Sequence, residues 1–474
     1  MVLAAVIAAG ASVGTEAANA TSATHASATR SALTLGFLDD RNFFADPVSG
    51  GAWLKRARAV NAQMVRTNLI WARVAPSRPP NPDAARDPAW PGYDWTKTDV
   101  AVRAASAGGL RVLLNFSAAP TWAEGPDPPK SHRAGTWRPN PAELGAFATA
   151  AARRYSGTFA DATGPLPRVA EWQAWNEPNL DYYLAPQWRR QKGRLVPASP
   201  QWYRRMLNRV YAGVKSVQAD ATVVSAGTAP YGDEAGSSRM RPARFNRELL
   251  CLGSTALEPL PCPDPAHFDA LDHHPYSIAG PRRHAINDDD VGIPDLSRLI
   301  RPLKRAERAG RALPAGRKAL WITEISWDSA PPDADGVPIA RHARWLQESF
   351  EILWRQGARV ILWLGVGDQP AVPNFASTYQ SGVFFRTGEP KPASTGFRFP
   401  FVIRCGARTC SAWGKNPRPD SPVVIERRTP AGWRPSVTLD AGSGGVFQVS
   451  LKMRPPFVVR ARSADDTSLS WTRR

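Results

Sequence analysis

Two glutamates each come directly after an apolar run of the sequence. Glu177 follows the run 169–175 by two residues, and Glu324 follows the run 319–323. If both runs are strands of one parallel barrel, the two carboxyl groups project from strand ends at the same mouth of the barrel. Such a pair can hydrolyse a glycosidic bond, because one carboxyl protonates the leaving oxygen while the other attacks the sugar or activates water. Either glutamate alone could instead be a salt-bridged residue on the rim.

The segments that must position these glutamates alternate along about 360 residues of the chain. Short apolar runs, typical of buried parallel strands, alternate with longer amphipathic stretches, typical of helices. The predicted strands are 33–38, 64–71, 111–116, 169–175, 222–226, 270–274, 319–325 and 359–364. The predicted helices are 53–62, 98–107, 141–155, 201–218, 243–251, 296–309 and 339–356. Eight strands that feed helices predict an α/β fold of the (β/α)8 or TIM-barrel type. A doubly wound sheet would normally have a glycine-rich first turn, and segment 38–42 has no glycine.

The segments around both glutamates resemble known motifs. Trp175-Asn176-Glu177-Pro178 and Ile322-Thr323-Glu324 resemble the acid/base and nucleophile motifs of the clan A retaining glycoside hydrolases. The nearest groups are the cellulase-like family 5 and the xylosidase- and iduronidase-like family 39, and the resemblance spans residues 33 to 395. It implies that Glu177 is the general acid/base, that Glu324 is the nucleophile, and that Asn176 holds the 2-hydroxyl of the sugar.

Further residues at strand ends fit this resemblance. His274 and Tyr276 are similar to the His-x-Tyr of these enzymes, in which the tyrosine hydroxyl donates to the nucleophile. A histidine cluster could instead bind a metal with Asp272 or His267, but adjacent residues on a strand point to opposite faces, so no metal is expected. A calcium site at 288–290 is the less favoured reading of an acidic turn.

Arg66 and Trp363 match two other positions of family 5. Arg66 would lie beneath the nucleophile, and its alternative is an interior ion-pair arginine. Trp363 would floor the cleaved subsite, because sugar C–H faces pack on indole rings, and its alternative is packing between barrel and helix. The end of the third strand departs from family 5, which has a histidine there. Its Pro120-x-Trp122 is closer to related clan A families, so Trp122 is a candidate substrate-binding residue.

Long loops are expected to wall a cleft above these residues. The segments 77–95, 125–138 and 181–199 are rich in proline and aromatic residues. Four aromatic residues are candidate substrate platforms or loop anchors, namely Trp122, Trp137, Tyr182 and Tyr183.

The chain is expected to divide into a barrel and a tail. Beyond residue 397 the helical period disappears, and five short alternating runs are separated by turn residues. This pattern predicts a barrel domain over 33–396 and a small antiparallel β-sandwich over 397–474. The segment 387–394 is the expected hinge.

The N-terminal 20 residues are predicted to be a secretory signal peptide, and 21–32 a linker. The stretch 2–13 is small and apolar, and Ala18-Asn19-Ala20 resembles a cleavage site, although no lysine or arginine precedes it. A buried or frayed helix is the alternative. Four cysteines, 11 and 5 residues apart in their pairs, suit two short-loop disulfides of a secreted protein.

Composition and charge bound the remaining possibilities. A hydrophobic share of 43% excludes a disordered protein. The sequence after the N-terminus contains no apolar run of eighteen residues, which excludes a polytopic membrane protein. The net charge of +19 permits an acidic polymer as partner, but the basic residues are dispersed and no nucleic-acid motif accompanies them. We therefore expect a secreted, monomeric enzyme that acts on oligosaccharides or polysaccharides without a cofactor, and binds neither nucleic acid nor membranes. A non-catalytic carbohydrate-binding barrel and a basic binder of acidic polymers are the alternatives.

Overall fold

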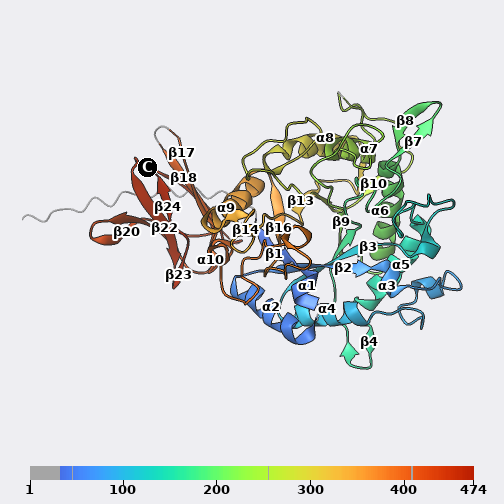
Figure 1. Cartoon of the computed structure of the whole chain (residues 1–474), viewed down its shortest axis with the longest axis horizontal. Coiled ribbons are helices and arrows are strands. Elements are labelled where there is room, and N and C mark those ends of the chain that lie inside the picture. The colour runs from blue at the N-terminus through green and yellow to red at the C-terminus, as the bar shows by residue number, and fades with distance from the viewer. Residues whose placement is uncertain (1–31, 45, 255, 407–408, 443, 474) are drawn as a thin grey trace, which may run out of the picture.

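The computed structural model describes residues 32–44, 46–254, 256–406, 409–442 and 444–473, so the predicted signal peptide and almost all of the linker lie outside the described residues. Its larger part is a closed barrel of eight parallel strands (Figure 1). In barrel order from one to eight, the strands are β1 (Thr34–Leu38), β2 (Met64–Ile70), β3 (Arg111–Ser117), β6 (Glu171–Ala174), β9 (Thr222–Ser225), β11 (Ala270–Asp272), β13 (Ala319–Ile322) and β16 (Ala358–Leu364). β16 pairs with β1 and closes the barrel, so the predicted TIM barrel is confirmed.

The eight predicted strands are all present, but several end earlier than predicted. The predicted run 169–175 is regular only over Glu171–Ala174, and the run 319–325 only over Ala319–Ile322. The first of these strands begins two residues later than predicted, and both end before their predicted carboxyl ends. There the backbone leaves the ladder to present side chains at the barrel mouth.

Helices follow the strands around the outside of the barrel (Figure 1). The main ones are α2 (Pro47–Ala59), α4 (Thr96–Ala107), α5 (Pro141–Arg154), α6 (Ser199–Lys215), α7 (Pro242–Leu249), α8 (Ser297–Arg308), α9 (Ile339–Arg355) and α10 (Pro392–Arg398). The short ones are α1 (Asp40–Phe44), α3 (Trp71–Val74) and the 3-10 turns η1 (Ala84–Arg86), η2 (Thr121–Ala123), η3 (Ile293–Asp295) and η4 (Phe375–Ser377). The seven predicted helices correspond to α2 and α4 to α9.

The eighth helix of the barrel, α10, begins inside the predicted hinge. Its Phe397 is buried and stacks on Phe37 of β1, with ring centroids 4.3 Å apart, and it also packs edge-on against Phe350 of α9. The prediction of a hinge over 387–394 is therefore wrong at its carboxyl end. A helix of seven residues is too short to show an amphipathic period in the sequence.

Side chains from the strands fill the lower half of the barrel. They form a separate apolar cluster that consists of Met64, Leu113, Val224, Ala270, Trp321, Val360 and Leu362. Above this cluster the interior becomes polar, beginning with Arg66 and Gln173, which are 1% and 0% exposed. Buried polar groups require partners, so a hydrogen-bonded network is expected at this level of the barrel.

Short two-stranded sheets lie within the loops that connect the main strands and helices. They are β4 (Ala160–Asp161) with β5 (Gly164–Pro165), β7 (Trp188–Gln191) with β8 (Arg194–Pro197), β10 (Ala266–His267) with β12 (Ala312–Leu313), and β14 (Ser329–Ala330) with β15 (Val337–Pro338). Among the described residues, no helix is long and apolar enough to cross a membrane.

The tail forms two antiparallel sheets beside α9 and α10 (Figure 1). One contains β17 (Phe401–Cys405), β18 (Cys410–Lys415) and β21 (Val446–Leu451). The other contains β19 (Val423–Thr429), β20 (Gly432–Leu439), β22 (Phe457–Ser463), β23 (Asp466–Thr467) and β24 (Trp471–Arg473). The predicted β-sandwich and its five predicted strands are confirmed. β18 was missed because it is buried on both faces and its sequence does not alternate.

The tail is bound to the barrel by polar contacts at α9 and α10. The Phe401 N–H donates to Gln347 at 3.1 Å, and Arg404 Nε donates to Glu351 at 2.7 Å. The Arg344 guanidinium lies 3.9 Å from the ring centroid of Trp471. Residues of β17 and β24 therefore contact α9 directly.

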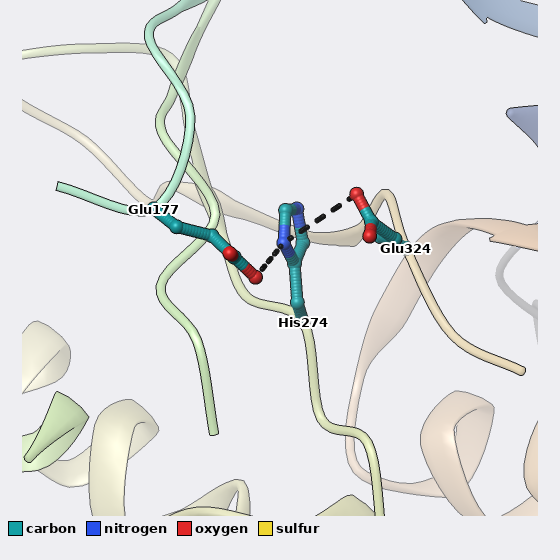
Figure 2. Close-up of side chains that lie close together, drawn as sticks. All are labelled: Glu177, His274 and Glu324. Atoms are coloured by element: carbon teal, nitrogen blue, oxygen red, sulfur yellow. Dashed lines mark hydrogen bonds and ion pairs between the residues drawn. The ribbon is translucent and has the colours of Figure 1, made fainter. Parts of the chain in front are cut away.

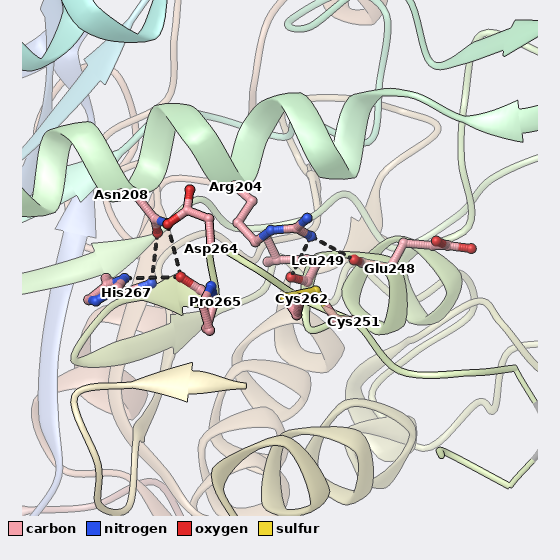
Figure 3. Close-up of a disulfide and its surroundings, with 9 residues drawn as sticks. All are labelled: Arg204, Asn208, Glu248, Leu249, Cys251, Cys262, Asp264, Pro265 and His267. Carbon is pink, nitrogen blue, oxygen red and sulfur yellow. Dashed lines mark hydrogen bonds between the residues drawn. A yellow bond between two sulfur atoms is a disulfide. The ribbon is translucent and has the colours of Figure 1, made fainter. Parts of the chain in front are cut away.

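Both predicted disulfides are present. Cys405–Cys410 links β17 to β18, and Cys251–Cys262 closes a loop after α7. Figure 3 shows that α6 lies against this loop. Arg204 of α6 donates to the carbonyls of Glu248 and Leu249 at 3.1 and 3.2 Å, which satisfies the carboxyl end of α7.

Candidate active site

Glu177 lies just beyond β6, the fourth strand of the barrel, in a turn of strained backbone. The φ angles of Trp175 and Glu177 are 86° and 35°, in the left-handed region that disfavours residues other than glycine. The Glu177 N–H donates to the Gly227 carbonyl at 3.0 Å, and the Trp175 indole N–H donates to the Tyr183 carbonyl at 2.9 Å. These contacts hold the turn in the conformation that presents the Glu177 carboxyl group.

Glu324 lies two residues beyond β13, the seventh strand, and its carboxyl group points toward that of Glu177 (Figure 2). One oxygen of each carboxyl group lies within 4.8 Å of the other. The side chains of Glu177 and Glu324 are 12% and 17% exposed. The structure thus brings the two predicted glutamates together at the barrel mouth.

Both oxygens of the Glu324 carboxylate accept hydrogen bonds. The Tyr276 hydroxyl donates to Oε1 at 2.8 Å, and Arg66 Nη1 donates to Oε2 at 3.2 Å. Arg66 also donates to Gln173 at 2.5 Å and to the Asn176 side-chain oxygen at 2.7 Å. Four predicted site residues therefore belong to one network around Glu324.

His274 lies between the two glutamates (Figure 2). Its Nδ1 is 2.9 Å from Glu177 Oε1 and 3.8 Å from Glu324 Oε2, and its Nε2 is 3.1 Å from the Thr323 hydroxyl. Burial opposes protonation of the ring, but the charge of Glu324 and the hydrogen bonds to Asp272 and Glu177 outweigh it and raise the pKa of His274 to about 10. The ring is therefore an imidazolium at neutral pH and donates a hydrogen bond to Glu177.

The pKa of Glu177 is raised above its ordinary value. Burial is the largest cause, the hydrogen bond and charge of His274 oppose it, and the charge of Glu324 adds to it. The two carboxyl groups therefore differ, because Glu177 is biased toward the protonated acid whereas Glu324 accepts hydrogen bonds from a cation and a hydroxyl.

Gln173 and Thr323 were not predicted as site residues, and Asp272 was considered only as a possible metal ligand, although all three hold the site from below. Gln173 Nε2 donates to Asp272 Oδ2 at 2.5 Å, and the Thr323 N–H donates to Asp272 Oδ1 at 2.9 Å. All three side chains are fully buried. Each of these residues is a polar residue within an otherwise apolar run of the sequence. Polar side chains are seldom buried in a barrel strand, so this pattern could have indicated them.

Glu177, His274 and Glu324 are also residue types that bind metal ions, and their ligand atoms lie close enough for one ion. Both ring nitrogens of His274 already have hydrogen-bond partners, at Glu177 and at Thr323. An ion would displace the proton shared by His274 and Glu177, so the contacts fit a proton-transfer site better than a metal site.

The other metal candidates of the sequence have different partners. His267 lies 3.0 Å from the Pro265 carbonyl through its Nδ1. Asp289 pairs with Arg247 at 2.7 Å, and Asp290 accepts from the Gly232 N–H at 3.0 Å. These side chains therefore take part in contacts within the loops that carry them.

A cleft of about 370 Å³ lies above Glu324 at the carboxyl ends of the strands. Its lining consists of Leu38, Asp39, Asp40, Arg41, Arg66, Asn68, Ile70, Ser117, Ala118, Arg133, Ala134, Gly135, Thr136, Asn176, Tyr182, Tyr183, Glu324, Leu364, Gln369 and Tyr379. Two of the three predicted loops, 125–138 and 181–199, contribute to it, but the loop 77–95 does not. The segments after β1 and β16 contribute residues that the sequence did not indicate.

Three predicted aromatic residues do not line the cleft. Trp363 is fully buried on the outer face of β16, where it packs against His342 and Phe350 of α9. Its place as the floor of the site is therefore a wrong prediction, because β16 turns this side chain away from the barrel interior. Trp122 anchors its loop through an indole hydrogen bond to the Ala75 carbonyl at 2.9 Å, and Trp137 likewise lies outside the cleft lining.

The closed parallel barrel, which has carboxylates at its fourth and seventh strand ends, is a fold that solved glycoside hydrolases share. Among solved structures, the chain is similar to a family 39 glycoside hydrolase from Bacteroides cellulosilyticus WH2, with a TM-score of 0.53 and 16% identity over 89% of this chain and 79% of that chain. It is also similar to a glucosidase from Croceicoccus marinus, with a TM-score of 0.50 and 13% identity over 90% of this chain and 94% of that chain. At these identities the likeness establishes the fold alone. No protein-family model and no curated protein sequence matches the chain.

Proposed function

We propose that this protein is a retaining glycoside hydrolase that cleaves O-glycosidic bonds, of β configuration, in oligosaccharides or polysaccharides. The observation that carries the proposal is the pair Glu177 and Glu324, whose carboxyl oxygens approach within 4.8 Å in two different environments. Retaining enzymes place their carboxyl groups about 5–5.5 Å apart, whereas inverting enzymes leave about 6.5–9.5 Å for a water molecule.

The surroundings of each carboxyl group suit one role in a double displacement. Glu177, with its raised pKa, donates a proton to the leaving oxygen. Glu324, oriented by Tyr276 and Arg66, attacks the anomeric carbon and forms a glycosyl ester. Glu177 then takes a proton from water, which hydrolyses the ester with net retention. In this mechanism Asn176, which accepts a hydrogen bond from Arg66 and lines the cleft, binds the 2-hydroxyl of the sugar.

Azide rescue tests both roles on aryl β-glycosides. Glu324→Ala is expected to lose turnover, and azide should enter the vacated space and give an inverted glycosyl azide. Glu177→Ala should spare substrates with very good leaving groups, because these need little protonation, and azide should then give the retained product. Glu389→Ala, which changes an exposed glutamate outside the cleft, is the matched control and should behave as the wild type.

Three results would contradict the proposal. They are net inversion by the wild type, full activity of either site variant, or an absence of turnover on every glycoside tested. Saccharide binding without turnover would leave the carbohydrate-binding barrel as the function.

Export and domain roles belong to the same proposal. Two disulfides fit an oxidising compartment, which supports a secreted protein. Mass spectrometry of the protein from its native host should find the mature N-terminus near Thr21, and an intact Met1 on cytoplasmic material would contradict export. We assign catalysis to residues 33–396 and support of the barrel to 397–474, in a chain that acts as a monomer.

A further inference from the structure

The aromatic platform expected at the end of the eighth strand is missing from the cleft. Trp363 points out of the barrel, and its indole N–H donates to the Ser381 carbonyl at 2.7 Å. The loop that follows the same strand nevertheless brings another aromatic ring to the cleft. This ring is Tyr379, which lines the cleft together with Glu324, Arg66 and Asn176.

The exposure of Tyr379 is not explained by packing. Its side chain is 50% exposed, and its hydroxyl has no hydrogen bond to any residue that the structure describes. The pKa of this hydroxyl is raised, first by burial and then by the negative charges of Glu324 and Glu177. A half-exposed aromatic ring that lines the same cleft as Glu324 suits a ligand that offers an apolar face and polar edges.

If Glu324 is the nucleophile, the cleft that contains Tyr379 holds the glycone side of the bond to be cleaved. In the proposed mechanism the nucleophile contacts the anomeric carbon of the glycone, whereas the acid contacts the oxygen of the leaving group. Glu324 lines the cleft and Glu177 does not. The sugar in the cleft is therefore the one that would become attached to Glu324.

We propose that Tyr379 is the aromatic platform of the cleaved subsite, whose ring packs on the C–H face of the glycone sugar. This inference rests on the proposed function. The ring would supply the apolar contact that Trp363 cannot provide. Asn176 and Arg66, which are hydrogen-bonded to each other, would bind the polar edge of the sugar.

Hydrogen bonds anchor the backbone on both sides of Tyr379, so the loop that carries the ring is positioned at the cleft before a sugar binds. The Gln369 N–H donates to the Tyr379 carbonyl at 2.9 Å, which closes the base of the loop. The Gln380 N–H donates to Asp328 at 2.7 Å, and the Gln380 carbonyl accepts from the buried Lys391 ammonium at 3.1 Å. An ordered platform loses little conformational entropy when a ligand binds.

Three variants test the platform. Tyr379→Ala is expected to raise KM on aryl β-glycosides at least about tenfold, because aromatic stacking is lost. Tyr379→Phe keeps the ring and should stay within about threefold of the wild type, since the hydroxyl has no partner. Val372→Ala, in the same loop but outside the cleft lining, should match the wild type. Thermal unfolding of each variant checks that the fold is intact.

Equilibrium binding of the same glycosides, measured by titration calorimetry, separates this inference from the proposed function. Weaker binding by Tyr379→Ala but not by Tyr379→Phe supports the platform, whether or not the wild type turns the ligand over. Equal KM and binding in Tyr379→Ala and wild type would overturn the platform alone. An equal loss in Tyr379→Phe and Tyr379→Ala would also overturn it, because the hydroxyl and not the ring would then matter. Failure of the wild type to bind any of the glycosides would overturn both proposals.

Discussion

Replacement of Lys391 by methionine should destabilise the protein in a manner that depends on pH. The Lys391 ammonium is fully buried and donates to Asp368 at 2.5 Å, to the Ser329 hydroxyl at 2.8 Å and to the Gln380 carbonyl at 3.1 Å. Methionine has a similar length and no charge. The Asp368 carboxylate would then be left in a buried place with the Gly382 N–H as its remaining donor.

The loss of stability in Lys391→Met depends on the protonation state of the Asp368 carboxyl group. Burial raises the pKa of Asp368 from 3.8 to about 6, although the charge of Lys391 lowers it. Because the folded value is the higher one, the contribution of Asp368 to stability is greatest below pH 3.8 and falls as pH rises through about 6, by about 3 kcal/mol at about 1.4 kcal/mol per pKa unit. Without Lys391 the pKa of Asp368 rises further, so this loss continues to higher pH. Removal of one partner from a buried ion pair costs about 3–5 kcal/mol of unfolding free energy. We expect Lys391→Met to lose this amount near pH 7.5, and to lose less at pH 5, where the Asp368 carboxyl group is protonated.

Urea unfolding at pH 5 and pH 7.5 measures this difference for the wild type, Lys391→Met, Asp368→Asn and the double variant. The double variant contains neither charge and should recover much of the stability that Lys391→Met loses at pH 7.5. Equal destabilisation of Lys391→Met at the two pH values would refute the reasoning. A double variant no more stable than Lys391→Met would refute it as well.

Three further changes have defined outcomes. Arg66→Met removes a charged donor from Glu324 and should lower kcat about 10²–10³-fold in steady-state kinetics with the fold retained; an unchanged kcat would exclude a role at the nucleophile. His274→Asn removes a hydrogen bond and a charge that lower the pKa of Glu177, so the alkaline limb of the pH–rate profile should move to higher pH; a shift to lower pH would contradict this order of effects. Phe397→Ala should cost about 3–5 kcal/mol in urea unfolding because it opens a cavity between β1 and α9, and a loss under about 1 kcal/mol would mean that this contact is dispensable.

The barrel could be predicted from the sequence because each of its strands is an apolar run that ends in polar residues. The same rule located Glu177 and Glu324, since the residue that follows a strand lies at the barrel mouth. Arg66, His274 and Tyr276 were predicted because they match motif positions of the glycoside hydrolase families that the sequence resembles, whereas the contact of His274 with Glu177 was not predicted.

Trp363 shows where such reasoning fails. A strand of a parallel barrel is buried on both faces, so its sequence is apolar throughout and does not reveal which residues face inward. In β16 the inward residues are Val360 and Leu362, and the alternation of side chains therefore turns Trp363 outward. Tyr379 could not be predicted for a different reason, because the path of a long loop is set by contacts such as those of Lys391 rather than by a local pattern.

Helix α10 has a bearing on how this protein could be engineered. Lys391, just before its first turn, holds the loop of Tyr379, and Arg398 in its last turn binds Asp466 of the tail at 2.6 Å. Seven helical residues span about 10 Å, so the short helix α10 connects the loop of Tyr379 at the cleft to the C-terminal sheets. A chimera that exchanged the tail at the start of α10 would cut this connection, whereas one joined after Arg398 would keep the loop anchor but lose the contact to Asp466. The tail is therefore not a freely interchangeable module, and its replacement should alter sugar binding even though it contributes no residue to the cleft lining.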